Sequence, residues 1–342
     1  MTVHTEQDVR IVDVPFVIRG RVIEEFDVEY RSGGIVFRTP DPHEHLMEIP
    51  LRSRTGMSDL HEITIDEIIE FLGALGERLN LRDNQHLQEC FSLTVNASNL
   101  TEPVLRTIYD EQLAQFFQTG RMKEAVERRL GVPYVEGWVR ETDVTGRNAR
   151  VRAFGARTTH VVAGNGPGVS AQTIVRNALT RSDAIIKTPA NDPVTAIAIL
   201  RTMIDLDADH PVTKHVSALY WRGGDELVEQ VAFSSPNIDK IVAWGGSSAI
   251  KHAAKFVGPG VELVALDPKI SISLLGAEVL TDAEVGSEAA RRLAFDVGLM
   301  NQEGCVSSRV AYVEVAVFQT PMTPSAISRE PSSSSCRHCP VR

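Results

Sequence analysis

The stretch Thr159-His160-Val161-Val162-Ala163-Gly164-Asn165-Gly166-Pro167-Gly168 joins a short apolar run to a glycine-rich loop. The apolar run predicts a β-strand, and the residues from about 170 to 180 have the apolar spacing of a helix. A strand that passes through a short loop into a helix is the unit from which parallel sheets are built. The stretch therefore predicts a parallel α/β sheet if the unit repeats along the chain.

The strand-helix unit does repeat downstream. Further strands are predicted at 184–187, 216–220 and 241–244, with helical patterns after each of them. This alternation predicts a doubly wound parallel sheet with helices on both faces and ligands at the carboxyl ends of the strands. Two strand-to-helix loops, Gly164 to Gly168 and Gly245-Gly246-Ser247-Ser248, place backbone N–H groups where phosphates bind at helix N-termini. Neither loop has the G-x-G-x-x-G fingerprint or a P-loop lysine, so glycines that serve only a tight turn are the alternative.

Two other patterns precede this sheet. Residues 1 to about 55 alternate apolar and polar positions between turn signals and predict short antiparallel strands. From Thr64 to about Arg129 the spacing is helical, which predicts helices packed beside the main domain, with Cys90 as a packing thiol among them. A second strand-like patch at 138–154 leads into the parallel sheet.

Composition excludes several classes of function. The 342 residues carry 35 Lys and Arg against 45 Asp and Glu, a net charge of −10 that gives no electrostatic footprint for nucleic acid. The first eight residues have neither a basic nor an apolar run, and no window approaches the roughly 18 apolar residues of a membrane span. Four cysteines are too few and too uneven for a disulfide framework, so we expect a cytoplasmic protein with reduced thiols.

Two clusters have the composition of metal sites. His43 and His45 lack a third ligand nearby in the sequence, and Cys336-Arg337-His338-Cys339 lacks a second pair. We therefore predict a polar turn and an incidental tail, and no metal.

Cys305 lies on a predicted turn between a helical segment, 283–300, and a strand-like one, 310–317. A thiol on a turn is exposed and becomes a nucleophile if its pKa is lowered, whereas a thiol in a core is inert. The flanking residues alone leave both interpretations open.

Four segments, in this order, resemble the aldehyde dehydrogenase superfamily, and within it most closely the acyl-CoA (fatty acid) reductases of bacterial bioluminescence. Segment 163–167 resembles the family's Trp-Asn-Phe-Pro loop, 182–189 its strand ending in Lys-Pro-Ser, 239–248 its Phe-Thr-Gly-Ser-Thr turn, and 301–309 its Gly-Gln-x-Cys segment. A further segment, 266–273, is similar to the Gly-Pro-Lys-x-Ser of the luminescence reductases and replaces the Glu-Leu-Gly-Gly of aldehyde oxidisers.

The resemblance implies an aldehyde dehydrogenase-like α/β fold, in which a doubly wound cofactor domain precedes a truncated catalytic α/β domain. The expected divisions are 1–155 for a β-rich and helical region, 156–282 for the dinucleotide-binding domain, 283–317 for the start of the catalytic domain and 318–342 for an aberrant, disordered tail. By the same resemblance, the expected catalytic residues are Cys305 as nucleophile and Asn165 as oxyanion donor, and the expected cofactor-binding residues are Lys187, Gly245, Gly246 and Ser247.

The implied function is NADPH-dependent reduction of a long-chain acyl thioester to the fatty aldehyde through a cysteine acyl-enzyme. Partner enzymes that transfer acyl groups and an oligomeric full-length protein are implied as well. Glu262 is the nearest candidate for the glutamate that activates water in aldehyde oxidation, but a reductase needs no hydrolytic water.

The likeness stops after Val317, where a segment rich in Pro and Ser begins. Since family members continue with more of the catalytic domain, a truncation is expected. The alternative function is therefore a catalytically inactive nucleotide-binding remnant or partner subunit. Trapping an acyl group on Cys305 distinguishes the two.

Overall fold

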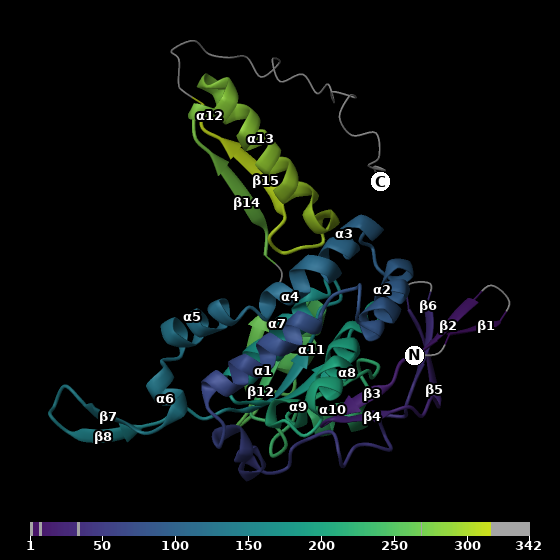
Figure 1. The fold of residues 1–342 in the computed structure, drawn as a ribbon, viewed down its shortest axis with the longest axis vertical. Coiled ribbons are helices and arrows are strands. Elements are labelled where there is room, and N and C mark those ends of the chain that lie inside the picture. The colour runs from purple at the N-terminus through teal and green to yellow at the C-terminus, as the bar shows by residue number, and fades with distance from the viewer. Residues whose placement is uncertain (1–2, 7–8, 33–34, 268, 316–342) are drawn as a thin grey trace.

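The computed structural model describes residues 3–6, 9–32, 35–267 and 269–315, and a seven-stranded sheet lies at its centre (Figure 1). In spatial order the strands are β13 (Glu262–Leu266), β12 (Lys240–Trp244), β9 (Arg157–Val161), β10 (Asp183–Lys187), β11 (Val216–Leu219), β3 (Phe16–Ile18) and β4 (Arg21–Ile23). The first five are parallel, and the β3–β4 hairpin adds two antiparallel strands beside β11. This arrangement confirms the parallel sheet predicted from the repeated strand-helix units.

The strand order contains a switch point. From β9 the chain moves outward through β10 and β11, and then returns to place β12 on the other side of β9. In open parallel sheets, ligands bind outside the carboxyl ends of the strands at such a point. The two glycine-rich loops follow β9 and β12, so both leave the sheet at the switch point.

Helices cover both faces of the sheet and enclose two separate hydrophobic cores. On one face, α7 (Gly168–Leu179) and α8 (Thr195–Asp207) pack with the preceding helical region, and on the other lie α10 (Glu226–Ala232) and α11 (Ser247–Ala254). Strand β10 shows the division, because Ala184 and Ile186 belong to the first core and Ile185 to the second. Alternation of side chains along a strand produces this arrangement, and the doubly wound prediction is confirmed.

The predicted helical region is present. It consists of α1 (Ile65–Arg78), α2 (Gln85–Ala97), α3 (Glu102–Thr107), a π-helical turn (Ile108–Gln112), α4 (Leu113–Phe116), α5 (Thr119–Arg129) and α6 (Val132–Glu136). Thr64 caps α1 through a reciprocal capping box with Glu67. Cys90 is fully buried on α2, with its Sγ 3.2 Å from the Tyr109 hydroxyl, and burial raises the pKa of its thiol to about 12. The prediction that Cys90 is a packing thiol is confirmed.

The N-terminal strands are arranged differently from the prediction. A second sheet has the order β1 (Val3–Glu6), β2 (Val9–Asp13), β6 (Ile35–Thr39) and β5 (Val28–Ser32), and its β2–β6 pair is parallel. The prediction of purely antiparallel strands in this region was therefore wrong. Parallel pairing becomes possible because the chain leaves this sheet between β2 and β6 to build the β3–β4 hairpin in the central sheet. The later patch forms an exposed hairpin of β7 (Val139–Thr142) and β8 (Asn148–Val151).

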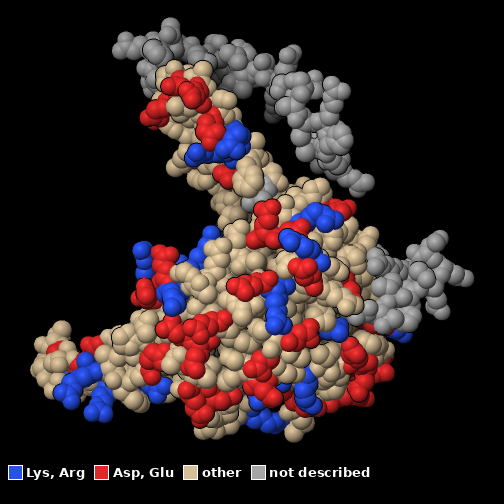
Figure 2. Space-filling model, in the orientation of Figure 1, with Lys and Arg blue, Asp and Glu red and all other residues tan. Residues whose placement is uncertain are grey.

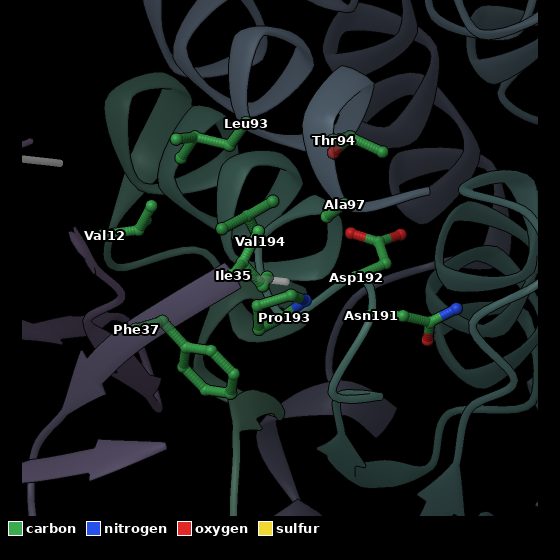
Figure 3. Close-up of a pocket in the computed structure, with 10 residues that line it drawn as sticks. All are labelled: Val12, Ile35, Phe37, Leu93, Thr94, Ala97, Asn191, Asp192, Pro193 and Val194. Carbon is green, nitrogen blue, oxygen red and sulfur yellow. The ribbon is translucent and has the colours of Figure 1, made fainter. Parts of the chain in front are cut away.

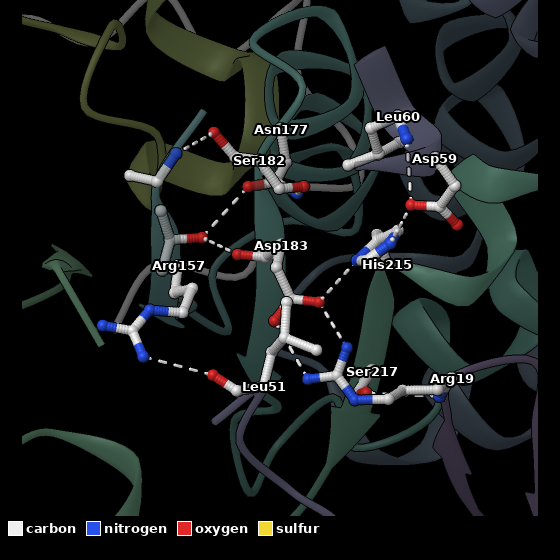
Figure 4. Close-up of polar contacts among 12 residues, drawn as sticks. Arg19, Leu51, Asp59, Leu60, Arg157, Asn177, Ser182, Asp183, His215 and Ser217 are labelled. Atoms are coloured by element: carbon white, nitrogen blue, oxygen red, sulfur yellow. Dashed lines mark hydrogen bonds and ion pairs between the residues drawn. The ribbon is translucent and has the colours of Figure 1, made fainter. Parts of the chain in front are cut away.

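Buried charges join the N-terminal segment to the amino-terminal edge of the central sheet (Figure 4). The carboxylate of Asp183, at the start of β10, accepts hydrogen bonds from both terminal nitrogens of the Arg19 guanidinium, one of them at 3.0 Å. The His215 ring, just before β11, lies with Nδ1 3.0 Å from Asp183 and with Nε2 2.8 Å from Asp59. Asp183 and His215 are buried, so this network fixes the N-terminal segment against the central sheet.

The last described segment forms a separate strand-helix-strand unit that projects from the central body (Figure 1). It comprises β14 (Ser271–Leu275), α12 (Glu278–Thr281), α13 (Ala283–Gly298), a 3₁₀ turn (Leu299–Gln302) and β15 (Ser308–Val313). β14, which was predicted within the dinucleotide-binding domain, pairs with β15 in parallel. We therefore propose that the boundary between the two domains lies between β13 and β14. The predicted tail, 318–342, with Cys336 and Cys339, lies outside the described residues.

On the face shown in Figure 2, acidic and basic side chains are intermixed over the central body. Across the described part of the chain, no helix is both long and apolar enough to cross a membrane. No cluster of three or more His, Cys, Asp or Glu side chains suited to a metal ion occurs among these residues either. His43 instead contacts Asp41 at 2.8 Å and Asp225 at 3.1 Å.

Candidate active site

One hydrogen bond brings the first glycine-rich loop to the Cys305 segment. The side-chain amide Nδ2 of Asn165 donates to the backbone carbonyl of Glu303 at 2.8 Å, across 138 residues of sequence. Glu303 lies two residues before Cys305. The two residues predicted to carry the chemistry therefore belong to neighbouring loops at the carboxyl edge of the parallel sheet.

Close packing explains two glycines of this loop. A Cβ on Gly166 would lie 2.5 Å from Cε of Met300, and a Cβ on Gly164 would overlap the Asn191 side chain. Neither glycine has a positive φ, so the backbone conformation itself does not require glycine. Close packing therefore requires glycine at both positions, and at Gly166 it does so where the loop meets the segment that precedes Cys305.

That segment has an unusual backbone. Met300, Asn301 and Gln302 all adopt left-handed conformations, with φ of 56°, 48° and 61°. Three consecutive non-glycine residues in this region are costly and persist only when their surroundings hold them. Arg309 donates to the carbonyl of Gln302 at 2.8 Å, and Asn301 donates to the carbonyl of Asn99 at 3.3 Å. The turn before Cys305 is thus held by contacts from both sides.

Cys305 itself is exposed on this turn. Its neighbours Gly304 and Ser307 are buried, and the N–H of Ser307 donates to the carbonyl of Gly304 at 3.1 Å. The Ser271 hydroxyl donates to the Cys305 carbonyl at 2.5 Å, which links the turn to the start of β14. The backbone of Cys305 is therefore fixed while its thiol is accessible, in contrast to the buried thiol of Cys90.

The predicted cofactor residues lie at the same edge of the sheet. Lys187 ends β10 and Trp244 ends β12, on either side of β9, with Lys187 and Ala243 both in register with Val161. Gly245 and Gly246 follow Trp244, and Ser247 begins α11. The Lys187 residue and the glycine turn therefore flank the switch point.

Lys187 has an unusual environment for a lysine. Its Nζ lies 5.4 Å from the ring centroid of Tyr220 and 5.2 Å from that of Trp221. Such positions give an ammonium cation–π attraction. Removal from water lowers the pKa of Lys187 to about 8, although nearby Glu229 acts in the opposite direction.

The turn after β12 fits a phosphate group. Gly246 is exposed at the N-terminus of α11, no side chain caps this helix end, and a Cβ on Gly246 would meet nothing within 4 Å. Unpaired N–H groups at the start of a helix favour anions. The residues present are thus compatible with a dinucleotide whose phosphates lie against this turn.

Glu262 lies away from this site. It begins β13 and forms an ion pair with Lys240 at the start of β12, with a Lys240 Nζ to Glu262 Oε2 distance of 2.8 Å. The carboxyl end of β13 is Leu266, four residues farther on and so about 13 Å along the strand. As a candidate for activating water, Glu262 is on the wrong edge of the sheet.

Two features of the site were not predicted. Asn191 contacts the glycine-rich loop, and Tyr220 and Trp221 lie beside Lys187. The aromatic pair had a sequence signal, because it follows directly on the strand that ends at Leu219 and strand ends carry ligand sites. Asn191 is a single polar residue in a loop, and nothing in the sequence distinguishes it from neighbours.

Comparison with known proteins gives the family. The family model described as acyl-CoA reductase (LuxC) matches residues 60–322. The chain belongs to this LuxC family. It is 36% identical over 301 residues to the long-chain acyl-protein thioester reductase of Aliivibrio fischeri, and 25% identical over 307 residues to that of Vibrio harveyi. Each match covers 87% of this chain and 60% of the relative, so this LuxC chain spans about three fifths of these relatives' length.

Solved structures show the same fold at low sequence identity. Lactaldehyde dehydrogenase from Escherichia coli matches with a TM-score of 0.67 at 17% identity, over 89% of this chain and 61% of that one. NADP-dependent glyceraldehyde-3-phosphate dehydrogenase from Bacillus halodurans, complexed with NADP, matches with a TM-score of 0.65 at 13% identity, over 88% and 61%. The predicted aldehyde dehydrogenase-like fold and the resemblance to luminescence reductases are both confirmed for this LuxC chain.

Proposed function

We propose that this chain carries the acyl-transfer and cofactor sites of an NADPH-dependent reductase, which converts a long-chain acyl thioester to the fatty aldehyde through an acyl-enzyme on Cys305. The observation that supports the proposal is the hydrogen bond from Asn165 to the Glu303 carbonyl, because it joins this side-chain amide to the backbone two residues before an exposed cysteine. The relatives named as long-chain acyl-protein thioester reductases support this substrate class. Acyl-CoA or an acyl-protein of a partner enzyme would supply the acyl group.

In the first half-reaction the Cys305 thiolate attacks the carbonyl carbon of the acyl thioester. The carbonyl oxygen becomes an oxyanion, and its collapse expels the carrier thiolate and leaves the acyl group on Cys305. In the second half-reaction hydride adds to the same carbon, and collapse returns the Cys305 thiolate and releases the aldehyde. A nicotinamide cofactor, held by Lys187 and the turn at Gly245 and Gly246, would supply this hydride. No step requires hydrolytic water, which agrees with the position of Glu262 at the far edge of the sheet.

The proposal is tested by incubating the protein with a radiolabelled long-chain acyl-CoA, mapping the labelled peptide, and then adding NADPH. We expect the label on the peptide that contains Cys305 and its discharge as aldehyde. Label on another residue would contradict the role of Cys305, and release only as free acid would contradict reduction.

Asn165 is expected to stabilise the oxyanion. A side-chain amide has two N–H donors, and one of them is engaged with the Glu303 carbonyl, which fixes the direction of the other. Replacing Asn165 with alanine should slow acylation of Cys305 by about 10²–10³-fold, the usual effect of removing one oxyanion donor. Single-turnover labelling at saturating acyl-CoA measures this rate. An effect below threefold would mean that Asn165 only joins the two loops.

Lys187 is expected to make cofactor binding depend on pH. If its ammonium contacts an anionic or ribose group of NADPH, the protonated form must be present, and its pKa of about 8 lies near the physiological range. The dissociation constant of NADPH should therefore rise above pH 8, approaching about tenfold per pH unit, as expected when binding requires one proton.

Fluorescence titration of NADPH between pH 7 and 9.5 checks this expectation. A Lys187→Arg variant is the matched control, because guanidinium stays charged over that range and should give a flat profile. An unchanged affinity and pH profile in Lys187→Ala would remove Lys187 from the cofactor site.

A further inference from the structure

Asn191 makes a hydrogen bond of the same kind as Asn165, from its side-chain amide to a backbone carbonyl. Its Nδ2 donates to the backbone carbonyl of Gly164 at 2.8 Å, and Gly164 immediately precedes Asn165. Asn165 in turn donates to the carbonyl of Glu303 at 2.8 Å. Two hydrogen bonds of the same kind thus lead from the loop after β10, through the glycine-rich loop, to the segment that holds Cys305.

The loop that carries Asn191 is anchored in the core. The carboxylate of Asp192 accepts hydrogen bonds from the N–H of Thr195 at 3.0 Å and from its hydroxyl at 2.8 Å, at the start of α8. The Thr195 hydroxyl also lies 2.6 Å from that of Tyr109, and all three side chains are buried. Because these partners are internal, Asn191 extends from a rigid turn.

Figure 3 shows how Asn191 is directed. Asn191, Pro193 and Val194 line a small pocket together with apolar side chains that include Val12 and Phe37. The side chain of Asn191 points away from these residues. Its amide therefore contacts the glycine-rich loop and does not extend into the pocket.

The contact between Asn191 and Gly164 is also steric. Since a Cβ on Gly164 would overlap the Asn191 amide, the loop can approach this closely only because residue 164 is glycine. The hydrogen bond and the packing together fix the position of the Gly164 backbone. They thereby also fix the backbone position from which the Asn165 side chain extends.

We propose that Asn191 is a positioning residue for acyl transfer: it sets the glycine-rich loop so that the Asn165 amide is directed at the reacting carbonyl on Cys305. This proposal rests on the function proposed above. Asn191 contacts neither the thiol nor the substrate, and all its effect passes through Asn165.

A double-mutant cycle tests this dependence. Asn191→Ala should slow single-turnover acylation of Cys305 by roughly 10- to 100-fold at saturating acyl-CoA, with the half-saturating concentration changed less than twofold. In an Asn165→Ala background the same substitution should change the rate less than about twofold, because residues that act through one contact are not additive. Independent, additive effects would overturn the proposal.

Two further variants separate positioning from general damage. Asn237→Ala removes a similar bond, from Asn237 Nδ2 to the Val231 carbonyl at 3.0 Å on the other side of the sheet, and should leave acylation unchanged. Gly164→Ala should slow acylation in the wild-type background but have little effect in Asn191→Ala, where the space for its methyl group is free. An equal loss from Gly164→Ala in both backgrounds would contradict the steric part of the proposal.

The same cycle measured with iodoacetamide distinguishes failure of the positioning from failure of the proposed function. Alkylation of the exposed Cys305 needs no reductase activity, and Asn191→Ala should change its rate less in the Asn165→Ala background than in the wild type. If acylation of Cys305 fails in the wild type but this pattern holds, the proposed function is wrong and the loop contact stands. If the alkylation effects add, the positioning role is wrong.

Discussion

Replacing Cys305 with alanine is expected to abolish acyl labelling and aldehyde formation, with a loss of at least about 10⁴-fold in acylation rate, as for removal of other catalytic nucleophiles. The structure gives the physical reason. Cys305 is the exposed thiol of the two cysteines in the described residues, and its turn is tied to β14 by Ser271 and to the glycine-rich loop by Asn165. Cys90, the other cysteine in the described part of the chain, is buried on α2.

The matched control is Cys90→Ala. Burial keeps the pKa of Cys90 at about 12, so its reactive thiolate is scarce at neutral pH, and the label should stay on Cys305 in this variant. NADPH binding, followed by fluorescence, should survive in Cys305→Ala, which separates loss of chemistry from loss of folding. Labelling of Cys305→Ser at the wild-type level would exclude Cys305 as the acyl carrier.

Local patterns predicted four of the parallel strands of the central sheet, β9 to β12, whereas β13 was not predicted as a strand. Each of these four strands contains or borders an apolar run and is followed closely in the sequence by a helix, so neighbouring residues are enough to predict the β-α units. The N-terminal strands are short, and their partners depend on contacts far away in the sequence. Ile18, for example, pairs with Ser217, and no periodicity in residues 1–55 indicates that partner.

The candidate site was predicted in part, for a related reason. Motif resemblance named Asn165 and Cys305, and the rule that ligands bind at strand ends placed them together. Glu262 was a candidate by sequence position, but its distance from Leu266 along β13 puts it at the opposite edge. Asn191 required the structure, because its importance comes from the direction of its side chain and from the space that Gly164 leaves.

The second large effect is expected at the opposite edge of the sheet, where Asp183→Ala should lower the free energy of unfolding by about 3–5 kcal/mol. Asp183 is almost completely buried, with its carboxylate between the guanidinium of Arg19 and the ring of His215. Removing this carboxylate leaves the partly buried guanidinium of Arg19 without its charged partner. Loss of one member of a buried pair is costly for that reason.

Urea unfolding followed by circular dichroism measures the change. Glu262→Ala is the control, since it removes a carboxylate from the same sheet, but from the exposed pair with Lys240. Exposed pairs contribute less than about 1 kcal/mol, so this variant should unfold almost as the wild type does. It should also keep its acylation rate, because Glu262 lies at the start of β13, at the edge of the sheet opposite to the glycine-rich loops.

The contribution of Asp183 to the free energy of unfolding should decrease at low pH. Burial alone would raise the pKa of this carboxyl, but hydrogen bonds from His215 and Arg19 outweigh burial and lower it. A carboxyl with a lowered pKa in the folded state stabilises the protein above its unfolded pKa of about 3.9. That stability is lost as the pH falls through the folded pKa. The difference in the free energy of unfolding between wild type and Asp183→Ala should therefore be largest at pH 6 and should shrink below about pH 4. A difference that does not change with pH would show that packing, and not charge, stabilises this edge of the sheet.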